Sequence, residues 1–289
     1  MGSVLLLRGP WALLINSISK KFYELRTVFR ILSYGVRMAR RQRLLEIDGC
    51  DLALALKADA IQLLDKGIVP LHHSLEDNLL QEIKTVVSEV LVEYGQSTGR
   101  LKIDEVFVEE RVSRYPGGEV YDAVYHHLFG VDNAVSGVRD SACVVETKEI
   151  LLRALGADLQ CYGFDVYVSK NSFSPRRLHM DGVFAYQYKT FIALTDVEDT
   201  DGPCVFLEGS HKNSLTKSLY LLSNFFRGRN VREIHDREFA KKYICKKALM
   251  KSGSAILSDQ HGFHGGSPQS HDGFREALVL YWTDSSRAY

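Results

Sequence analysis

The chain has 289 residues, of which 45% are hydrophobic and 25% are charged, an ordinary globular composition that suits one large domain with an appendage or two small domains. Its five cysteines lie far apart with no C-x-x-C pair, which argues against a disulfide framework or a zinc site and indicates a reducing compartment. No window supplies the ~20 consecutive apolar residues of a transmembrane helix, and we expect no nucleic-acid partner.

The formal net charge is zero, but the charges are unevenly distributed. Residues 1–43 carry nine lysines and arginines against one acid, Glu24, and residues 212–251 carry eleven against three acids. The rest of the chain is therefore acidic. Such basic stretches are typical of solvated helix faces, and they also suit contact with a membrane surface or with a phosphorylated or carboxylated substrate.

Residues 1–48 are predicted to form a basic, amphipathic helical arm. Between residues 11 and 45, apolar side chains recur at helical spacing among the basic ones; they are Leu14, Ile18, Phe22, Leu25, Phe29, Leu32 and Val36. This apolar face could be received by a partner or by lipid headgroups, or it could pack on the body of its own domain. We expect a cytoplasmic location, with peripheral membrane contact and an organelle transit peptide left open; the start lacks the basic n-region of a secretory signal.

Helical patterns and then strand-like patterns follow the arm. Helices are predicted over residues 51–66 and from about 74 to 94, with a short strand-like piece at 67–70 between them. After residue 99 the pattern changes to short β-type runs separated by clusters of Gly, Pro, Asn and Asp. These runs cover residues 102–108, 160–169, 188–196, 204–207, 254–258 and 275–283. They predict an α+β fold with a mainly β core, a sandwich or barrel, interrupted by a largely helical, basic insertion at 212–251.

The first motif that carries chemistry is His179-Met180-Asp181. In an extended strand, residues i and i+2 point to the same face, so His179 and Asp181 can present an imidazole and a carboxylate to one point. These are two of the three ligands of a 2-His-1-carboxylate triad, which leaves open positions on Fe(II). Alone the triplet is weak, because it arises often by chance.

The second motif lies near the C-terminus. His264 is followed eleven residues later by Arg275, which begins an apolar strand-like run. His264 can supply the third ligand. The alternate residues Ala277 and Val279 share the face of Arg275, and an unpaired guanidinium on an interior face would be costly. Arg275 therefore needs an anion, for which a bidentate carboxylate is the natural partner.

Between the two motifs, the sequence reads Leu-Thr-Asp at 194–196, an acidic turn with Gly-Pro at 202–203, and Gly-Ser-His at 209–211. With the His-x-Asp before it and the His…Arg after it, this order resembles the phytanoyl-CoA dioxygenase family. The resemblance covers roughly residues 50–289, and the domain that we predict from it spans residues 49–289.

The resemblance implies a double-stranded β-helix, which is a jelly roll of the cupin type, and it implies Fe(II), the co-substrate 2-oxoglutarate and O2. It carries over His179, Asp181 and His264 as the metal ligands and Arg275 as the anchor of the distal 2-oxoglutarate carboxylate. Phe191 falls where the family places a residue beside the cofactor, although an ordinary core aromatic suits that position equally. No catalytic residue beyond the metal ligands is expected.

The function predicted on this basis is a dioxygenase that hydroxylates an unidentified small-molecule or lipid-like substrate and releases succinate and CO2. The basic insertion favours an anionic substrate group. Related halogenases replace the carboxylate ligand with a small residue, so Asp181 favours hydroxylation. The alternatives are a non-catalytic jelly-roll binding module and a metal-dependent cupin-type enzyme that does not use 2-oxoglutarate.

Two details qualify the resemblance. Many members of the family have a serine two residues after the distal histidine, where this chain has Gly266, with Ser267 one position further. His261 competes with His264 as the distal ligand, but the eleven-residue spacing to Arg275 favours His264 and leaves His261 a surface or outer-shell residue. The remaining histidines are expected to pack or to be solvated rather than to bind metal: His211, His72–His73 and His126–His127.

Overall fold

The computed structural model describes residues 54–284 apart from 96, 98, 115–119, 182–186 and 213, together with residues 21, 25, 26, 28 and 29; at 112–114, 120–124 and 284 it describes the backbone alone. The helices are α2 (Leu54–Lys66), α3 (Asp77–Tyr94), α4 (Val131–Ala134), α5 (Ala142–Leu155), α6 (Leu215–Phe226) and α7 (Arg237–Ala240), with a 3-10 turn at Val138–Asp140. The strands are β1 (Ile68–Pro70), β2 (Arg100–Ile103), β3 (Val106–Arg114), β4 (Val120–Phe129), β5 (Leu159–Lys170), β6 (Tyr188–Ala193), β7 (Cys204–Glu208), β8 (Ile244–Ala248), β9 (Ala255–Asp259), β10 (His264–Gly266) and β11 (Phe274–Asp284).

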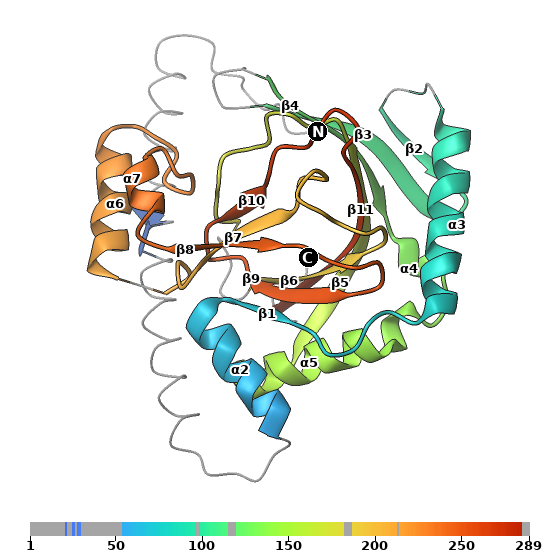
Figure 1. The fold of residues 1–289 in the computed structure, drawn as a ribbon, viewed down its shortest axis with the longest axis horizontal. Coiled ribbons are helices and arrows are strands. Elements are labelled where there is room, and N and C mark those ends of the chain that lie inside the picture. The colour runs from blue at the N-terminus through green and yellow to red at the C-terminus, as the bar shows by residue number, and fades with distance from the viewer. Residues whose placement is uncertain are drawn as a thin grey trace, which may run out of the picture.

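The strands form two antiparallel sheets. The large sheet has the order β1-β9-β6-β11-β5-β4-β3-β2, and the small sheet has the order β10-β7-β8. Figure 1 shows the small sheet inside the curve of the large one, with α2, α3 and α5 along the outer side. Two facing sheets with helices on the outside form the jelly roll that the sequence predicted, in the α+β, mainly β class.

The large sheet separates two environments, because successive side chains of a strand point to opposite faces. On β11, Leu278, Leu280 and Trp282 lie in the main hydrophobic core, which the sheet shares with the outer helices. The alternate residues of β11 face inward, where Arg275, Ala277 and Val279 line a cavity. β5 and β6 follow the same alternation. One face of the sheet therefore stabilises the fold, while the other is free to carry a site.

The sequence of α5 explains where this outer helix ends and which face it buries. Gly156 ends α5 with φ 64°, in the left-handed region that glycine adopts without strain. The buried face of α5 includes Ile150 and Leu151, at 0% exposed. Its apolar residues recur at helical spacing and pack into the same core as α2 and α3.

The predicted helices at 51–66 and 74–94 are present, and so are the strands predicted near 160–169, 188–196, 204–207, 254–258 and 275–283. The elements α4, α5, β4 and β10 were not predicted from the sequence. Two further predictions differ from the structure. The run predicted as one strand at 102–108 is a hairpin, since Asp104 has φ 48° and turns the chain between β2 and β3. The insertion at 212–251 contains α6 and α7, but its last part is the strand β8, which pairs with β7 in the small sheet. The domain boundaries at 48 and 49 lie outside the described residues.

Only a few residues of the N-terminal arm are described, and those are helical. Val28 is 1% exposed and packs in a second cluster with Leu221, Phe239 and Phe263, whereas Phe29 is 64% exposed. At this point the arm packs on the body of the protein, as one of the two predicted alternatives has it. Among the described residues, no helix is long and apolar enough to cross a membrane.

Candidate metal centre and adjoining cavity

His179, Asp181 and His264 lie together although 83 positions separate Asp181 from His264 in the sequence. Each offers one ligand atom, and the three atoms lie within 4.8 Å of one another. His179 Nε2 lies 3.3 Å from Asp181 Oδ1, and His264 Nε2 lies 3.6 Å from Asp181 Oδ2. This is the set of residues that the two motifs predicted.

Backbone pairing brings the two motifs together. The amide of His179 donates to the carbonyl of His264 at 2.8 Å, and the amide of His264 donates back to the carbonyl of His179 at 2.9 Å. This bridge extends the short strand β10 to the His-x-Asp segment. Met180, which points the other way, is 1% exposed in the second hydrophobic cluster. The alternation expected of an extended segment therefore holds at His179 and Asp181.

The insertion supports the other edge of the same segment. Met180 donates its amide to the carbonyl of Arg232 at 2.8 Å, and Ile234 donates to the carbonyl of Leu178 at 2.8 Å. Glu233, 3% exposed, lies opposite His179 and accepts a hydrogen bond from Arg176 at 3.3 Å. The sequence identified this insertion only by its charge and did not predict that it flanks the metal motif.

Both imidazoles are oriented by their second nitrogen. His179 Nδ1 lies 3.0 Å from the carbonyl oxygen of Arg177, and His264 Nδ1 lies 3.0 Å from that of Gly262. A carbonyl can only accept, so each Nδ1 carries the proton and each Nε2 presents a lone pair toward Asp181. Ring orientation by an outer hydrogen bond is the usual arrangement of metal-binding histidines.

The protonation states also suit a cation. Burial lowers the pKa of His179 to about 4, and the nearby His264 contributes to this shift, so the imidazole is neutral near pH 7. Burial alone would raise the pKa of Asp181, but the neighbouring Lys189 ammonium brings it well below its ordinary value. Two imidazoles and one carboxylate are a donor set that divalent iron or zinc accepts.

Lys189 is a residue of this centre that the sequence did not single out for function. Its Nζ lies 2.5 Å from Asp181 Oδ2, and its side chain is 14% exposed. It also lies 5.0 Å from the centre of the Tyr281 ring. Lys189 and Phe191 stand two residues apart on the inner face of β6, and this spacing was the one signal available in the sequence.

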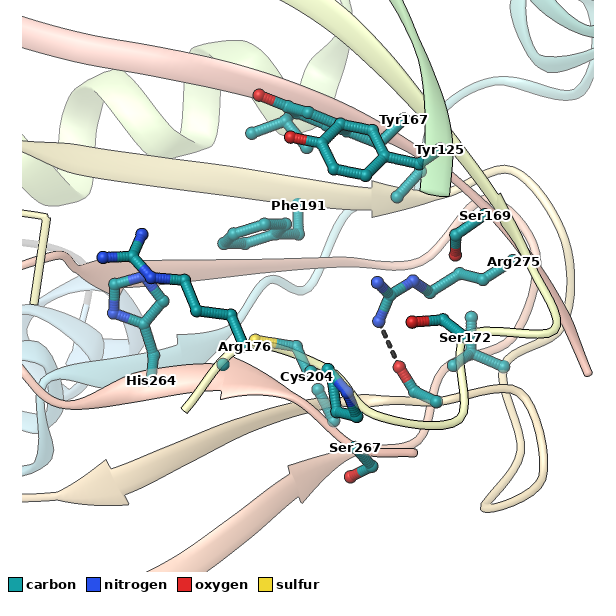
Figure 2. Close-up of a pocket in the computed structure, with 18 of the residues that line it drawn as sticks. Tyr125, Tyr167, Ser169, Ser172, Arg176, Phe191, Cys204, His264, Ser267 and Arg275 are labelled. Atoms are coloured by element: carbon teal, nitrogen blue, oxygen red, sulfur yellow. Dashed lines mark hydrogen bonds between the residues drawn. The ribbon is translucent and has the colours of Figure 1, made fainter. Parts of the chain in front are cut away.

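A cavity of about 360 Å³ opens beside the three residues, between the two sheets. Its walls come from β4, β5, β6 and β11 of the large sheet and from β7, β8 and β10 of the small one. Figure 2 shows His264 toward one end, Arg275 toward the other, and Phe191 between them. The volume falls within the usual range for small-molecule sites.

Arg275 is the cationic group at the far end of the cavity. Its guanidinium donates to the carbonyl of Gly202, and burial lowers its pKa, although an arginine stays charged at any physiological pH. Among the described residues, no carboxylate makes an ion pair with Arg275. The hydroxyl-bearing side chains Ser169, Ser172 and Ser267 surround it in Figure 2. An anionic ligand would complete this end of the cavity.

The competing histidines lie elsewhere. His261 is 2% exposed and bonds Asp259 through Nδ1 at 3.0 Å, so the surface position considered for it is wrong. His211 is buried and bonds the carbonyl of Leu64 at 3.0 Å, in keeping with a packing role. Gly266 lines the cavity, and a Cβ there would come within 3.9 Å of the Arg275 guanidinium, so a larger residue would narrow this end.

The fold and the site define a jelly-roll protein with a candidate 2-His-1-carboxylate centre beside a buried arginine. The chain belongs to the phytanoyl-CoA dioxygenase (PhyH) family, whose model matches residues 82–277. The family predicted from the two motifs and the segment between them is thereby confirmed. Comparison with curated protein sequences finds no match.

Several solved structures share the fold. AviO1 from Streptomyces viridochromogenes Tue57 matches with 13% identity and a TM-score of 0.55, covering 82% of this chain and 99% of that protein. The epimerase SnoN, in complex with Fe3+, alpha ketoglutarate and nogalamycin RO, matches with 14% identity and a TM-score of 0.57, and the match covers 80% of this chain and 84% of SnoN. EctD from S. alaskensis, with 2-oxoglutarate and 5-hydroxyectoine, matches with 14% identity and a TM-score of 0.56, and the match covers 79% of this chain and 76% of EctD. At such identities the likeness shows the fold alone, and it confirms the predicted jelly roll.

Proposed function

We propose that the protein is an Fe(II)- and 2-oxoglutarate-dependent dioxygenase that hydroxylates a small molecule, with release of succinate and CO2. The observation that carries this proposal is the content of one cavity. It holds two histidines and a carboxylate with converging ligand atoms, and a buried arginine that makes no ion pair with any of the described carboxylates. A metal and a dicarboxylate would satisfy both ends at once.

In this proposal His179, Asp181 and His264 hold iron. The oriented Nε2 atoms and the ionised carboxylate are the donors, and the backbone bridge between the two histidines keeps the donors in place before metal arrives. Bound iron with 2-oxoglutarate supplies the oxidation of an unactivated C–H bond with O2. The structure of SnoN is a complex with Fe3+ and alpha ketoglutarate, and that of EctD contains 2-oxoglutarate, which supports the assignment of these cofactors.

Arg275 would bind the carboxylate of 2-oxoglutarate that is distant from the metal, and Phe191 would pack against the carbon chain between the two ends. The planar guanidinium can hold a carboxylate through two parallel hydrogen bonds. The inner faces of β6 and β11 contribute mostly apolar side chains here, among them Phe191, Ala277 and Val279. They would exclude water and hold the co-substrate in one orientation.

The substrate would enter the cavity beside Arg176. Arg176 lines the cavity, and its side chain is 32% exposed, so it can offer a cation to an anionic substrate group. Hydroxylation is the outcome that we propose, because the carboxylate ligand Asp181 is present. The neighbouring structures include an epimerase and a carbocyclase, and identification of the product by mass spectrometry separates these outcomes.

The test uses the absorption of the anaerobic protein with Fe(II) and 2-oxoglutarate, followed by succinate formation in air. Wild type should develop a weak visible charge-transfer band, and alanine at His179, Asp181 or His264 should remove it. A non-catalytic binding module or a cupin-type enzyme without 2-oxoglutarate would give no such band in wild type.

Arg275→Ala should raise the KM for 2-oxoglutarate far more than it changes Fe(II) affinity. A hydrogen bond to a charged group is worth roughly 1.5–3 kcal/mol, so the loss should be about ten- to a few hundred-fold. Arg275→Lys should recover only part, because a point charge does not reproduce the planar fork. Arg100→Ala is the control, since Arg100 is exposed on β2. An unchanged KM in Arg275→Ala would refute the co-substrate assignment.

A further inference from the structure

A second group of potential metal ligands lies away from the cavity. It joins Asp59 on α2, His72 in the segment that follows β1, and Glu146 on α5. Figure 1 shows α2 and α5 side by side on the outer side of the large sheet, with the segment after β1 running along α5 toward α3. Three parts of the chain that are distant in sequence meet at this point.

The donor atoms of this group lie close enough together to share one cation, as do those of the candidate metal centre in the cavity. One ligand atom from each of Asp59, His72 and Glu146 lies within 4.8 Å of the others. His72 Nε2 lies 3.0 Å from Asp59 Oδ2. His73 adds a second imidazole, since its Nδ1 lies 3.0 Å from Glu146 Oε2. Two imidazoles and two carboxylates therefore converge on one small region.

The backbone holds both imidazoles against α5. The amides of His72 and His73 each donate to the Glu146 carboxylate at 2.9 Å, one to each oxygen. Glu146 thereby fixes the segment after β1 in a conformation in which adjacent histidines reach two different carboxylates. A carboxylate has about four lone-pair sites, so Glu146 can accept both amides and still offer an oxygen to a cation.

The two buried carboxylates of this group favour a bound cation. Asp59 and Glu146 are 8% and 4% exposed, and the ion pairs that these two carboxylates make are with His72 and His73. Buried carboxylates are costly unless they are paired or bound to a metal. A divalent cation would neutralise both carboxylates. The His72 side chain is 59% exposed, which gives a cation an entry path from solvent.

We propose that Asp59, His72 and Glu146 form a second divalent-cation site of the Zn2+ type, with His73 beside them as a further imidazole. Mixed imidazole and carboxylate donors suit Zn2+. The metal would replace the hydrogen bond between His72 and Asp59, and any proton on the coordinating Nε2 would go to solvent. It would fasten α2 and the segment after β1 onto α5, and so hold β1 at the edge of the large sheet.

The experiment counts bound metal in variants of the full chain. Equilibrium dialysis against Zn2+, with metal measured by mass spectrometry, should give wild type two equivalents that depend on these two sites. His179→Ala/His264→Ala should keep one of them. Adding His72→Ala or Asp59→Asn to that double variant should weaken the remaining equivalent by more than about 100-fold, because losing a ligand costs more than losing an outer-shell partner.

His271→Ala is the matched control, because His271 also sits beside an acid, Asp272, but its side chain is 92% exposed; the bound metal should not change. Zn2+ should also raise the Tm of the double variant, and His72→Ala should abolish that rise. A double variant that binds no Zn2+, or one whose metal persists after His72→Ala, overturns the proposal. Failure of the iron assignment would leave the His72-dependent equivalent in place, so the two proposals fail separately.

Discussion

Lys189→Met tests how the centre in the cavity is held together without metal. The Lys189 ammonium lies 2.5 Å from Asp181 Oδ2, on the side of the carboxylate to which His264 Nε2 also points at 3.6 Å. It therefore stabilises the buried Asp181 carboxylate in the metal-free protein and repels a cation that approaches the same oxygen. Methionine keeps the length and the apolar stem of the side chain but removes the charge.

The magnitude follows from the burial of the pair. Removing one partner of a buried ion pair costs about 3–5 kcal/mol. The Asp181 side chain is 20% exposed and keeps both histidines as neighbours, so we expect a loss of about 2 kcal/mol in the metal-free protein. This lowers the Tm by roughly 4–8 °C in a protein of this size. A metal that neutralises Asp181 restores that energy, so metal affinity should rise roughly thirtyfold.

The assay is anaerobic calorimetric titration with Co2+ in the absence of 2-oxoglutarate, together with thermal unfolding of the metal-free protein. Lys189→Arg should keep the wild-type values approximately, since it keeps the cation. Lys251→Met is the matched control, because Lys251 pairs with Asp196 where both side chains are more than half exposed, and such pairs contribute little. Equal or weaker Co2+ binding in Lys189→Met would refute this account of the centre.

Two further predictions concern the supporting structure. Burial lowers the pKa of Lys217 from 10.5 to about 7, so the unfolded chain binds more protons between these values. The unfolding free energy should then rise by about 2 kcal/mol from pH 7 to pH 9 in urea titrations, and Lys217→Met should lack this rise. Val28 is 1% exposed and Phe29 is 64% exposed, so Val28→Ala should lose about 1–2 kcal/mol of stability and Phe29→Ala almost none. Equal losses from the two would mean that the arm does not pack on the body.

The candidate site residues of the cavity could be predicted from the sequence because their relative placement depends on local spacing. His179 and Asp181 stand two apart in an extended segment, and Arg275 begins a strand whose alternate residues line the same cavity. Period two is a property of any strand, so both motifs could be read without knowing the fold. The family resemblance then fixed their order in the jelly roll and selected His264 over His261.

Contacts between residues that are distant in the sequence could not be predicted in the same way, because no local spacing pattern marks them. Lys189 contacts Asp181, which is eight positions away, and no spacing rule predicts this contact. A lysine in a strand ordinarily indicates a solvated face. His72 and Glu146 are 74 positions apart, and two adjacent histidines do not face one metal in regular structure. The irregular segment after β1 lets His72 and His73 reach different carboxylates, and only the packing of α2 beside α5 brings those carboxylates together.

The two ends of the cavity differ in how firmly the fold holds them. The metal motif is paired on both edges, to β10 and to the insertion, and Arg275 lies on β11, which is paired on both sides to β5 and β6. The distance between the candidate metal centre and Arg275 is therefore set by backbone hydrogen bonds, which would suit the proposed co-substrate of fixed length. Arg176 lies instead on the segment that connects β5 and β6, at the cavity wall. Substitutions there can change the shape of the cavity without moving Arg275, so in the proposed enzyme this segment would govern substrate choice and the paired strands would hold the oxidative chemistry.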